Sequence, residues 1–255
     1  MPLTPASADS FQLAHGEVHV WCASLDVPPG TSSRMYATLT PDERDRSARF
    51  RFGRDRQHFI VAHGVLRDLL GRYLETDAGR IRYVYNTCGK PRLAPELGSR
   101  ITFNLSHSAG LALVAITADA NVGVDLEYVR PQSDHAEIAR RFFSRVEVEH
   151  LMALPNDLYA EAFFSCWTRK EAYLKACGEG LATPLDSFSV PLTIDPSQTA
   201  AEFRPAATSI VRAKRWSFHT LRPASGYLGS LAIEGRGWRL IHRHWPCAGL
   251  LDFAI

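Results

Sequence analysis

Two similar helix-start signals each begin a segment of the chain with the same expected order of helices and strands. Residues 40–43 (Thr-Pro-Asp-Glu) and 144–147 (Ser-Arg-Val-Glu) each place a hydroxyl residue three positions before a glutamate, which is the capping-box pattern. Each signal predicts a short helix, followed by a longer helix and then by strand-like runs. Helices followed by strands, twice, favour an α+β fold with two similar halves related by a pseudo-twofold, each with a long helix packed on a small antiparallel sheet.

The long helices are expected from about Asp55 to Leu74 and from about Asp157 to Cys177, where Gly178 ends the second. Strand-like runs are expected at Ile81–Tyr85, Ile101–Leu105, Leu111–Thr117, Phe188–Leu192, Arg215–Leu221, Tyr227–Ile233 and Trp238–His244. A boundary near residues 119–121 would give halves 1–120 and 121–255. We expect the active site in the cleft between them, because small-molecule sites commonly form between domains.

A charged residue interrupts the apolar stripe of the second long helix. At helical spacing Phe163, Phe164, Trp167, Glu171 and Leu174 fall along one side, so Glu171 lies where a core residue is expected. A buried carboxylate requires a partner. A solvated pair between Glu171 and Lys175, four residues later, is the simpler alternative.

Two more carboxylates share one face of a predicted strand. In residues 122–128, alternation places Asp125 and Glu127 on the face opposite to the apolar residues. Such carboxylates lie about 6–7 Å apart along a strand and repel each other unless a cation lies between them. With Glu171 they would form an all-oxygen site, which suits Mg²⁺ better than zinc. A solvent-facing strand end is the alternative.

Together these segments resemble the two signature motifs of the Sfp-type 4′-phosphopantetheinyl transferases. The motifs are a Gly-Val/Ile-Asp-x-Glu strand, here residues 123–127, and a Trp-x-x-Lys-Glu-x-x-x-Lys helix, here residues 167–175. Further similar stretches follow the family order between about Thr40 and Val190. They are Gly89–Pro91, Phe103–Ser108, Arg141–Ser144, Gly180–Leu181 and Pro184–Val190.

The resemblance implies an activity and a set of functional residues. Members of this family transfer the phosphopantetheine arm of coenzyme A to a serine of an apo acyl or peptidyl carrier protein, with Mg²⁺ or Mn²⁺, and release adenosine 3′,5′-bisphosphate. By resemblance, Asp125, Glu127 and Glu171 would bind the metal. Lys175 would contact the pyrophosphate, and Glu171 would be the general base. Arg46, Lys90, Pro91, Ser106 and His107 would bind the nucleotide, with His107 at the 3′-phosphate.

One position departs from the family pattern. Relatives often carry two basic residues early in the first short helix, whereas this chain has Glu43 and Arg46 there. Only Arg46 is therefore carried over as a phosphate contact.

A basic and aromatic segment follows the predicted metal strand. Arg140, Arg141 and Arg145 flank Phe142 and Phe143. A solvated helix end explains many such clusters. In this family, however, the segment after the Asp-x-Glu strand meets the carrier protein, and arginine beside exposed aromatic side chains suits a transient contact with its acidic helix. Fatty-acid, polyketide and nonribosomal-peptide carriers remain equal alternatives.

Other polar clusters have simpler explanations. Ser106, His107 and Ser108 are expected in a polar turn between two strands; adjacent residues there point to opposite sides, so Ser106 and His107 form no nucleophile–base pair. The pairs His15/His19 and His242/His244 are interpreted as structural or surface histidines. The segment 178–180 (Gly-Glu-Gly) is too short for a phosphate loop.

Composition excludes several functional classes. The 255-residue chain has a net charge of +2 and no long run of like charges, which argues against nucleic-acid binding. Five scattered cysteines without a Cys-x-x-Cys motif indicate a reducing compartment. No leader-like or membrane-spanning apolar run is present, so we expect a cytoplasmic, monomeric protein. The alternatives to a transferase are a non-catalytic coenzyme A or carrier-binding module and a Mg²⁺-dependent phosphohydrolase.

Overall fold

The computed structural model describes residues 11–130, 134–178, 180, 183–192, 200–203 and 215–246. The α-helices are α1 (Pro29–Thr38), α2 (Pro41–Ala48), α3 (Gly53–Tyr73), α4 (His135–Phe142), α5 (Arg145–Met152) and α6 (Asn156–Cys177). The strands are β1 (Glu17–Ser24), β2 (Tyr83–Tyr85), β3 (Pro91–Leu93), β4 (Ile101–Ser108), β5 (Leu111–Ala118), β6 (Val122–Tyr128), β7 (Ala200–Phe203), β8 (Trp216–Leu221), β9 (Tyr227–Glu234) and β10 (Arg239–Trp245). Short 3₁₀ turns occupy Ala78–Arg80, Pro95–Leu97 and Leu185–Ser187.

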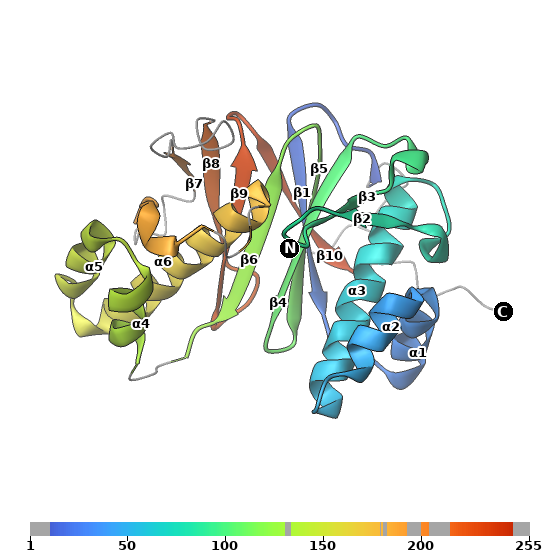
Figure 1. The fold of residues 1–255 in the computed structure, drawn as a ribbon, viewed down its shortest axis with the longest axis horizontal. Helices are drawn as coiled ribbons and strands as arrows, with labels where there is room; N and C mark the ends of the chain where they lie inside the picture. The colour runs from blue at the N-terminus through green and yellow to red at the C-terminus, as the bar shows by residue number, and fades with distance from the viewer. Residues whose placement is uncertain are drawn as a thin grey trace, which may run out of the picture.

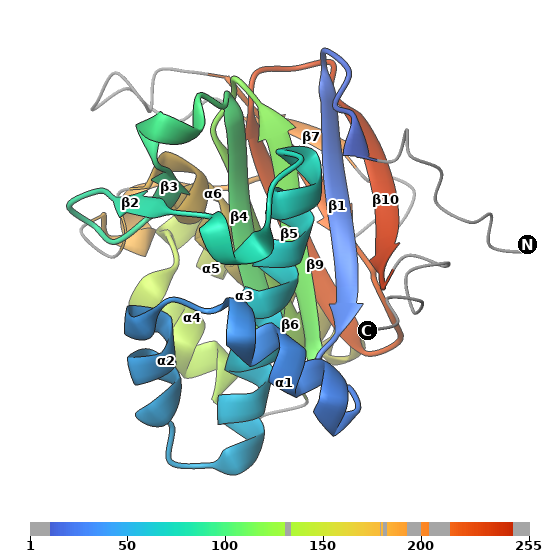
Figure 2. The same ribbon diagram turned by 90° about the vertical axis from the view of Figure 1, so that its right-hand side faces the viewer.

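The elements form four layers, with two four-stranded sheets between two groups of helices (Figure 1), and β2 and β3 pair as a separate small sheet. The first sheet has the strand order β10-β1-β5-β4 and the second β6-β9-β8-β7. One apolar core lies between α3 and the first sheet, a second between α6 and the second sheet, and a third between the two sheets. Figure 2 shows α1 and α2 beside α3 on the outer side of the first sheet. The mixed α+β architecture with two similar halves confirms the expected fold class.

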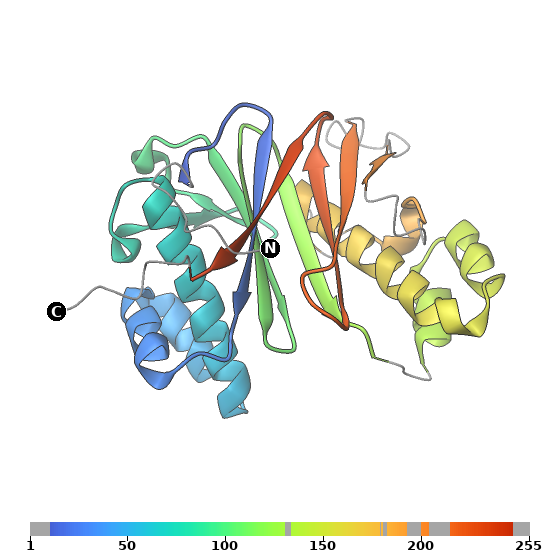
Figure 3. The same cartoon turned by 180° about the vertical axis from the view of Figure 1, so that it is seen from behind.

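The last strand departs from the expected division of the chain. β10 pairs in parallel with β1, from Glu17 opposite Arg239 to Ala23 opposite Trp245, and so belongs to the first sheet (Figure 3). The other strand pairs of both sheets are antiparallel. The C-terminal segment therefore returns to the first half, which a boundary at residue 120 did not anticipate.

The predicted helix starts and stops are confirmed. Thr40 and Ser144 both accept a hydrogen bond from the backbone N–H three residues later and complete capping boxes with Glu43 and Glu147. α6 ends at Gly178, whose φ of 71° is left-handed, a conformation that glycine adopts without strain. Helix α1 was not predicted.

Each capping-box glutamate also forms a buried ion pair with the long helix of its own half. Glu43 Oε2 lies 2.8 Å from Arg67 Nε of α3, and Glu147 Oε2 lies 2.7 Å from Lys170 Nζ of α6. In both halves the cation also donates to two carbonyl groups of the segment after the long helix. These are Ala78 and Ile81 for Arg67, and Leu185 and Phe188 for Lys170. These equivalent ion pairs support a relationship between the two halves that sequence identity alone does not show.

These buried ion pairs explain why Glu43 is a structural residue and why residues 188–192 form no strand. Burial alone would raise the pKa of Glu43, but hydrogen bonds from His63 and Thr40 and the charge of Arg67 lower it to about 2, so Glu43 is an ionised core residue. The predicted strand at 188–192 is wrong. Its backbone is hydrogen-bonded by side chains instead, because Lys170 donates to Phe188 O and Glu147 accepts from Val190 N.

Candidate active site

Strand β6 separates apolar from acidic side chains as its alternation predicted. Val122, Val124 and Leu126 enter the core between the sheets. The other face is directed toward α6, where a Cβ atom at Gly123 would meet the carbonyl oxygen of Ala172 at 2.1 Å. Gly123, Asp125 and Glu127 share one face of β6. Because Gly123 has no side chain, α6 can approach the strand closely beside the two carboxylates.

Helix α6 brings Glu171 and Lys175 to this face. Lys175 Nζ lies 2.6 Å from Asp125 Oδ1 and donates to Ser106 Oγ at 3.0 Å. Trp167, Glu171 and Lys175 are all partly exposed and follow one line on α6, whereas their neighbours are buried. The expectation that Glu171 occupies a core position was therefore wrong: it lies at the margin of the buried surface, because α6 is buried over more of its circumference than the stripe suggested.

Strand β4 meets β6 through side chains. Val124 N donates to Asn104 Oδ1 at 2.8 Å, Leu126 N to Ser106 Oγ at 3.3 Å and Tyr128 N to Ser108 Oγ at 3.3 Å. We call Asn104, Ser106 and Ser108 the side-chain ladder. Residues 106–108 thus belong to a strand; the turn expected there is shorter, with Ala109 and Gly110 at positive φ.

The two serines of the side-chain ladder also contact the acidic residues. Ser106 Oγ donates to Asp125 Oδ1 and Ser108 Oγ donates to Glu127 Oε2, both at 3.0 Å. The adjacent His107 points to the other side of β4, as expected for neighbouring strand residues.

The charge of Asp125 destabilises the ionised forms of the two nearby glutamates. The pKa values of Glu127 and Glu171 are raised, in each case first by burial and then by the negative charge of Asp125. Asp125 is buried, and its Oδ2 receives no hydrogen bond from any described residue. Oxygen donors with unbalanced negative charge fit a hard cation such as Mg²⁺. Within the described residues, however, no three side chains already surround one point closely enough to hold a metal.

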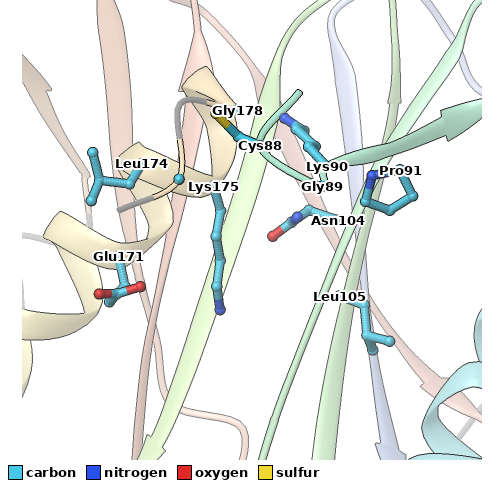
Figure 4. A pocket seen from close by; sticks show the side chains of 11 residues that line it. Cys88, Gly89, Lys90, Pro91, Asn104, Leu105, Glu171, Leu174, Lys175 and Gly178 are labelled. Carbon is cyan, nitrogen blue, oxygen red and sulfur yellow. The ribbon is translucent and has the colours of Figure 1, made fainter. Parts of the chain in front are cut away.

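A pocket of about 240 Å³ opens beside these residues, between α6, β4 and the β2–β3 loop. Figure 4 shows Glu171, Leu174 and Lys175 on one side of it and Lys90, Pro91, Asn104 and Leu105 on the other. The ammonium group of Lys90 donates to Val122 O and to Ala176 O near the end of α6, at 3.1 and 2.8 Å. Burial and the nearby Arg92 lower the pKa of Lys90 to about 8. Lys90 therefore holds the β2–β3 loop against α6 and β6.

His107 and Arg46 lie toward α2 and α3. His107 is an exposed residue, but the protein around its ring reduces the hydration of the charged form. Its pKa is lowered to about 4, first by this effect and then by His63, Lys175 and His58. Asp55 opposes this shift. Arg46 lies over the ring of Phe59, with its Cζ 5.6 Å from the ring centroid. The Phe59 ring packs against the His63 ring at a tilt of 31°, with the centroids 4.1 Å apart. Ser106 and His107 thus serve different faces of β4.

Glu127 lines a second pocket, of about 290 Å³. Its lining includes Ser108, Tyr128, His135, Phe163 and Trp167. The neighbouring helix α4 exposes Arg140, Arg141 and Phe142, whereas Phe143 is buried against Phe163 and Trp167. Of the two phenylalanines predicted at this surface, only Phe142 is available to a partner.

The remaining histidine and cysteine expectations concern residues outside the acidic cluster. His19 is fully buried in hydrogen bonds with Tyr73 and Glu17, and burial lowers its pKa to about 4. His242 and His244 are exposed on β10. Cys22, Cys88 and Cys166 are free thiols, while Cys247, Glu179 and Leu181 lie outside the described residues. None of the described helices is long and apolar enough to cross a bilayer.

Sequence reasoning missed the contribution of Asn104 and Ser108. Their spacing of two, with Ser106, is the available signal, since residues i, i+2 and i+4 share one face of a strand. The turn expected over residues 106–108 would end that alternation at Leu105, so the side-chain ladder does not follow from it.

Two family descriptions match adjacent parts of the chain: residues 29–119 match "4′-phosphopantetheinyl transferase, N-terminal", and residues 121–232 match "4′-phosphopantetheinyl transferase superfamily". The chain is also 39% identical over 231 residues to 4′-phosphopantetheinyl transferase HetI of Nostoc sp., covering 90% of this chain and 93% of the relative. The chain belongs to the 4′-phosphopantetheinyl transferase family.

Other members of the family match with lower identity. Sfp of Bacillus subtilis is 34% identical over 164 residues, covering 64% of this chain and 71% of the relative. The human L-aminoadipate-semialdehyde dehydrogenase-phosphopantetheinyl transferase is 27% identical over 211 residues, covering 77% and 67%. The family assignment identifies the chain as an enzyme that transfers phosphopantetheine from coenzyme A to carrier proteins.

Proposed function

We propose that this transferase is Mg²⁺-dependent and moves 4′-phosphopantetheine to a carrier serine, with adenosine 3′,5′-bisphosphate as the second product. The observation that carries the proposal is the meeting of Asp125, Glu127, Glu171 and Lys175 beside the 240 Å³ pocket. No separate observation favours either alternative, a non-catalytic binding module or a phosphohydrolase.

Asp125, Glu127 and Glu171 are the proposed metal ligands. The buried, unpartnered Asp125 Oδ2 and the raised pKa values of the two glutamates support this set. A bound Mg²⁺, or Mn²⁺ in its place, would supply positive charge to the pyrophosphate. Small side-chain movements are required, because the carboxylates do not already surround one point.

Each catalytic side chain has a proposed task. The serine Oγ of the carrier attacks the phosphorus that bears the pantetheine arm, and the pyrophosphate P–O bond to the adenosine 3′,5′-bisphosphate leaving group breaks. Glu171 accepts the serine proton, which its raised pKa favours relative to an ordinary glutamate. Lys175 leaves Asp125 for the pyrophosphate and balances its charge. Positioning and charge stabilisation are the main contributions in such transfers.

The nucleotide is proposed to bind along β4 and the β2–β3 loop. Pro91 offers an apolar pocket wall, and Lys90 contributes by shaping this loop, since its ammonium group is engaged with two carbonyls. Ser106 holds Lys175 near the pyrophosphate. His107, with Arg46 on the same side of β4, is proposed for the 3′-phosphate.

The carrier is proposed to approach the pocket beside Glu127. There it would meet Arg140, Arg141 and the exposed Phe142, while Arg145 is engaged with Glu149. An acidic carrier helix complements these arginines.

One mixture tests the proposed function. Protein, Mg²⁺, coenzyme A and an apo carrier should give a carrier whose mass rises by one phosphopantetheine arm, with adenosine 3′,5′-bisphosphate in equal amount. Asp125→Ala should abolish this gain at limiting Mg²⁺, because a proposed charged ligand is removed. Cleavage of coenzyme A without carrier modification would indicate the phosphohydrolase, and coenzyme A binding without either product the binding module. A panel of apo carriers would rank the fatty-acid, polyketide and peptide types.

A further inference from the structure

Strands β4 and β6 are neighbours that belong to different sheets. β6 pairs with β9 through its other edge, from Val122 opposite Ile233 to Tyr128 opposite Tyr227. The edge of β6 that faces β4 therefore needs hydrogen-bond partners from outside its own sheet. The side-chain ladder of Asn104, Ser106 and Ser108 supplies them at successive N–H groups.

The hydroxyl groups in this ladder each join a backbone group to a carboxylate. A serine hydroxyl has one hydrogen to donate and two lone pairs to accept. Ser108 accepts from Tyr128 N and donates to Glu127 Oε2, so it links the fixed backbone of β6 to the side chain of the preceding residue. Ser106 does the same for Leu126 N and Asp125, and its second lone pair accepts from Lys175.

Glu127 needs this restraint more than Asp125. Asp125 is buried and paired with Lys175, whereas Glu127 has a longer side chain, is partly exposed, and lies between the acidic cluster and the 290 Å³ pocket. The hydrogen bond from Ser108 Oγ to Glu127 Oε2 favours one orientation of this carboxylate.

We propose that Ser108 is a positioning residue for phosphopantetheine transfer, which holds the carboxylate of Glu127 in the orientation required for a divalent cation. The proposal rests on the proposed function. Ser108 acts through Glu127.

The decisive experiment measures metal affinity apart from turnover. Binding of Mn²⁺ by electron paramagnetic resonance, with and without coenzyme A, and the Mg²⁺ concentration for half-maximal transfer are compared for wild type, Ser108→Ala and Ser108→Thr. Loss of a residue that orients a metal ligand typically weakens metal affinity by about 10–100-fold. Ser108→Ala should therefore weaken Mn²⁺ binding and raise the Mg²⁺ requirement by about tenfold or more. Ser108→Thr keeps the hydroxyl and should restore most of both.

A matched control is available on the same strand. Thr102 lies on the same face of β4, but its hydroxyl donates to a backbone carbonyl, Ala120 O. Thr102→Val should therefore leave Mn²⁺ affinity unchanged. Amide hydrogen exchange gives an independent readout of geometry: Ser108→Ala should accelerate exchange at Tyr128 and leave Val124, bonded to Asn104, protected.

The outcomes separate the two proposals. Unchanged Mn²⁺ affinity in Ser108→Ala, or equal losses in Ser108→Ala and Thr102→Val, would overturn the positioning role even if transfer fell. A wild-type protein that binds Mn²⁺ but modifies no carrier would refute the proposed function, while the Mn²⁺ comparison would still decide the role of Ser108.

Discussion

Gly123 lies so close to α6 that a Cβ atom on it would meet Ala172 O at 2.1 Å and Ala176 N at 2.4 Å. Both contacts are to backbone atoms of a helix, which cannot move aside as a flexible side chain can. The first position of the Gly-x-Asp-x-Glu strand therefore sets the distance between the strand that carries Asp125 and the helix that carries Glu171. The backbone conformation does not require glycine at this position, since the φ angle of Gly123 is not positive.

Gly123→Ala should accordingly separate α6 from β6. We expect a loss of about 1–3 kcal/mol in the free energy of unfolding, as for other overpacked sites, and a larger relative loss of transfer activity. Denaturant unfolding and the transfer assay check this. Gly30→Ala in α1, where nothing lies within 4 Å, should be neutral or slightly stabilising. Similar stability and activity in both variants would show that the close approach is not required.

Lys170 belongs to the signature helix but contributes to the fold. It is fully buried, pairs with Glu147 and donates to two carbonyls. Lys170→Met should leave Glu147 buried without its cation, at a cost of about 3–5 kcal/mol in unfolding free energy. The control is Arg145→Ala, which removes an exposed pair with Glu149 and should leave the Tm unchanged. A stable but inactive Lys170→Met protein would instead place this lysine in the reaction.

The sequence predicted those features that depend on local pattern. Capping boxes, the two long helices and the alternation that places Asp125 and Glu127 on one face all follow from residues within a few positions of one another. The signature motifs added the identities of Glu171 and Lys175.

The remaining features depend on partners distant in sequence. The pairing of β10 with β1 joins segments near the two ends of the chain, and no local pattern specifies it. Residues 106–108 have a polar, turn-like composition, yet they form a strand because their side chains serve the backbone of β6. The backbone after Leu185 is bonded by Lys170 and Glu147, so a strand-like composition there does not lead to a strand.

Repulsion among the carboxylates should appear in metal-free stability. The pKa of Glu127 is raised in the folded protein, so between its ordinary and raised pKa the native state binds more protons than the unfolded state. The free energy of unfolding should therefore fall as pH rises through that interval. Glu127→Gln should reduce this fall, leaving the part due to Glu171, and should be the more stable protein in EDTA at neutral pH. Unfolding in EDTA across this pH range checks the prediction, and a less stable Glu127→Gln would contradict it.

His107→Ala should distinguish coenzyme A from dephospho-coenzyme A. A charge-assisted bond to the 3′-phosphate contributes roughly 1.5–3 kcal/mol, so affinity for coenzyme A should fall by that amount while dephospho-coenzyme A is little affected. The pKa of about 4 in the free protein implies that the ring is neutral at pH 6 and takes up a proton as the phosphate binds. Calorimetry in buffers of different ionisation enthalpy measures that proton. Equal losses for both ligands would remove His107 from this role.

Glu171→Gln separates the two proposed tasks of this residue, metal ligand and general base. The amide keeps the shape and one neutral oxygen donor but cannot accept the serine proton. If Glu171 serves only as a ligand, raised Mg²⁺ should largely restore kcat. If it is also the base, a loss on the order of 10²–10⁴-fold should persist at saturating Mg²⁺, with coenzyme A binding nearly intact. We expect the persistent loss, because burial and the charge of Asp125 raise the pKa of Glu171 toward the working pH of a base. Lys175→Ala should differ from both, with weaker pyrophosphate binding and an unchanged pH dependence of kcat, since this lysine supplies charge and accepts no proton. Full recovery of Glu171→Gln by Mg²⁺ would assign proton removal to a group other than this carboxylate.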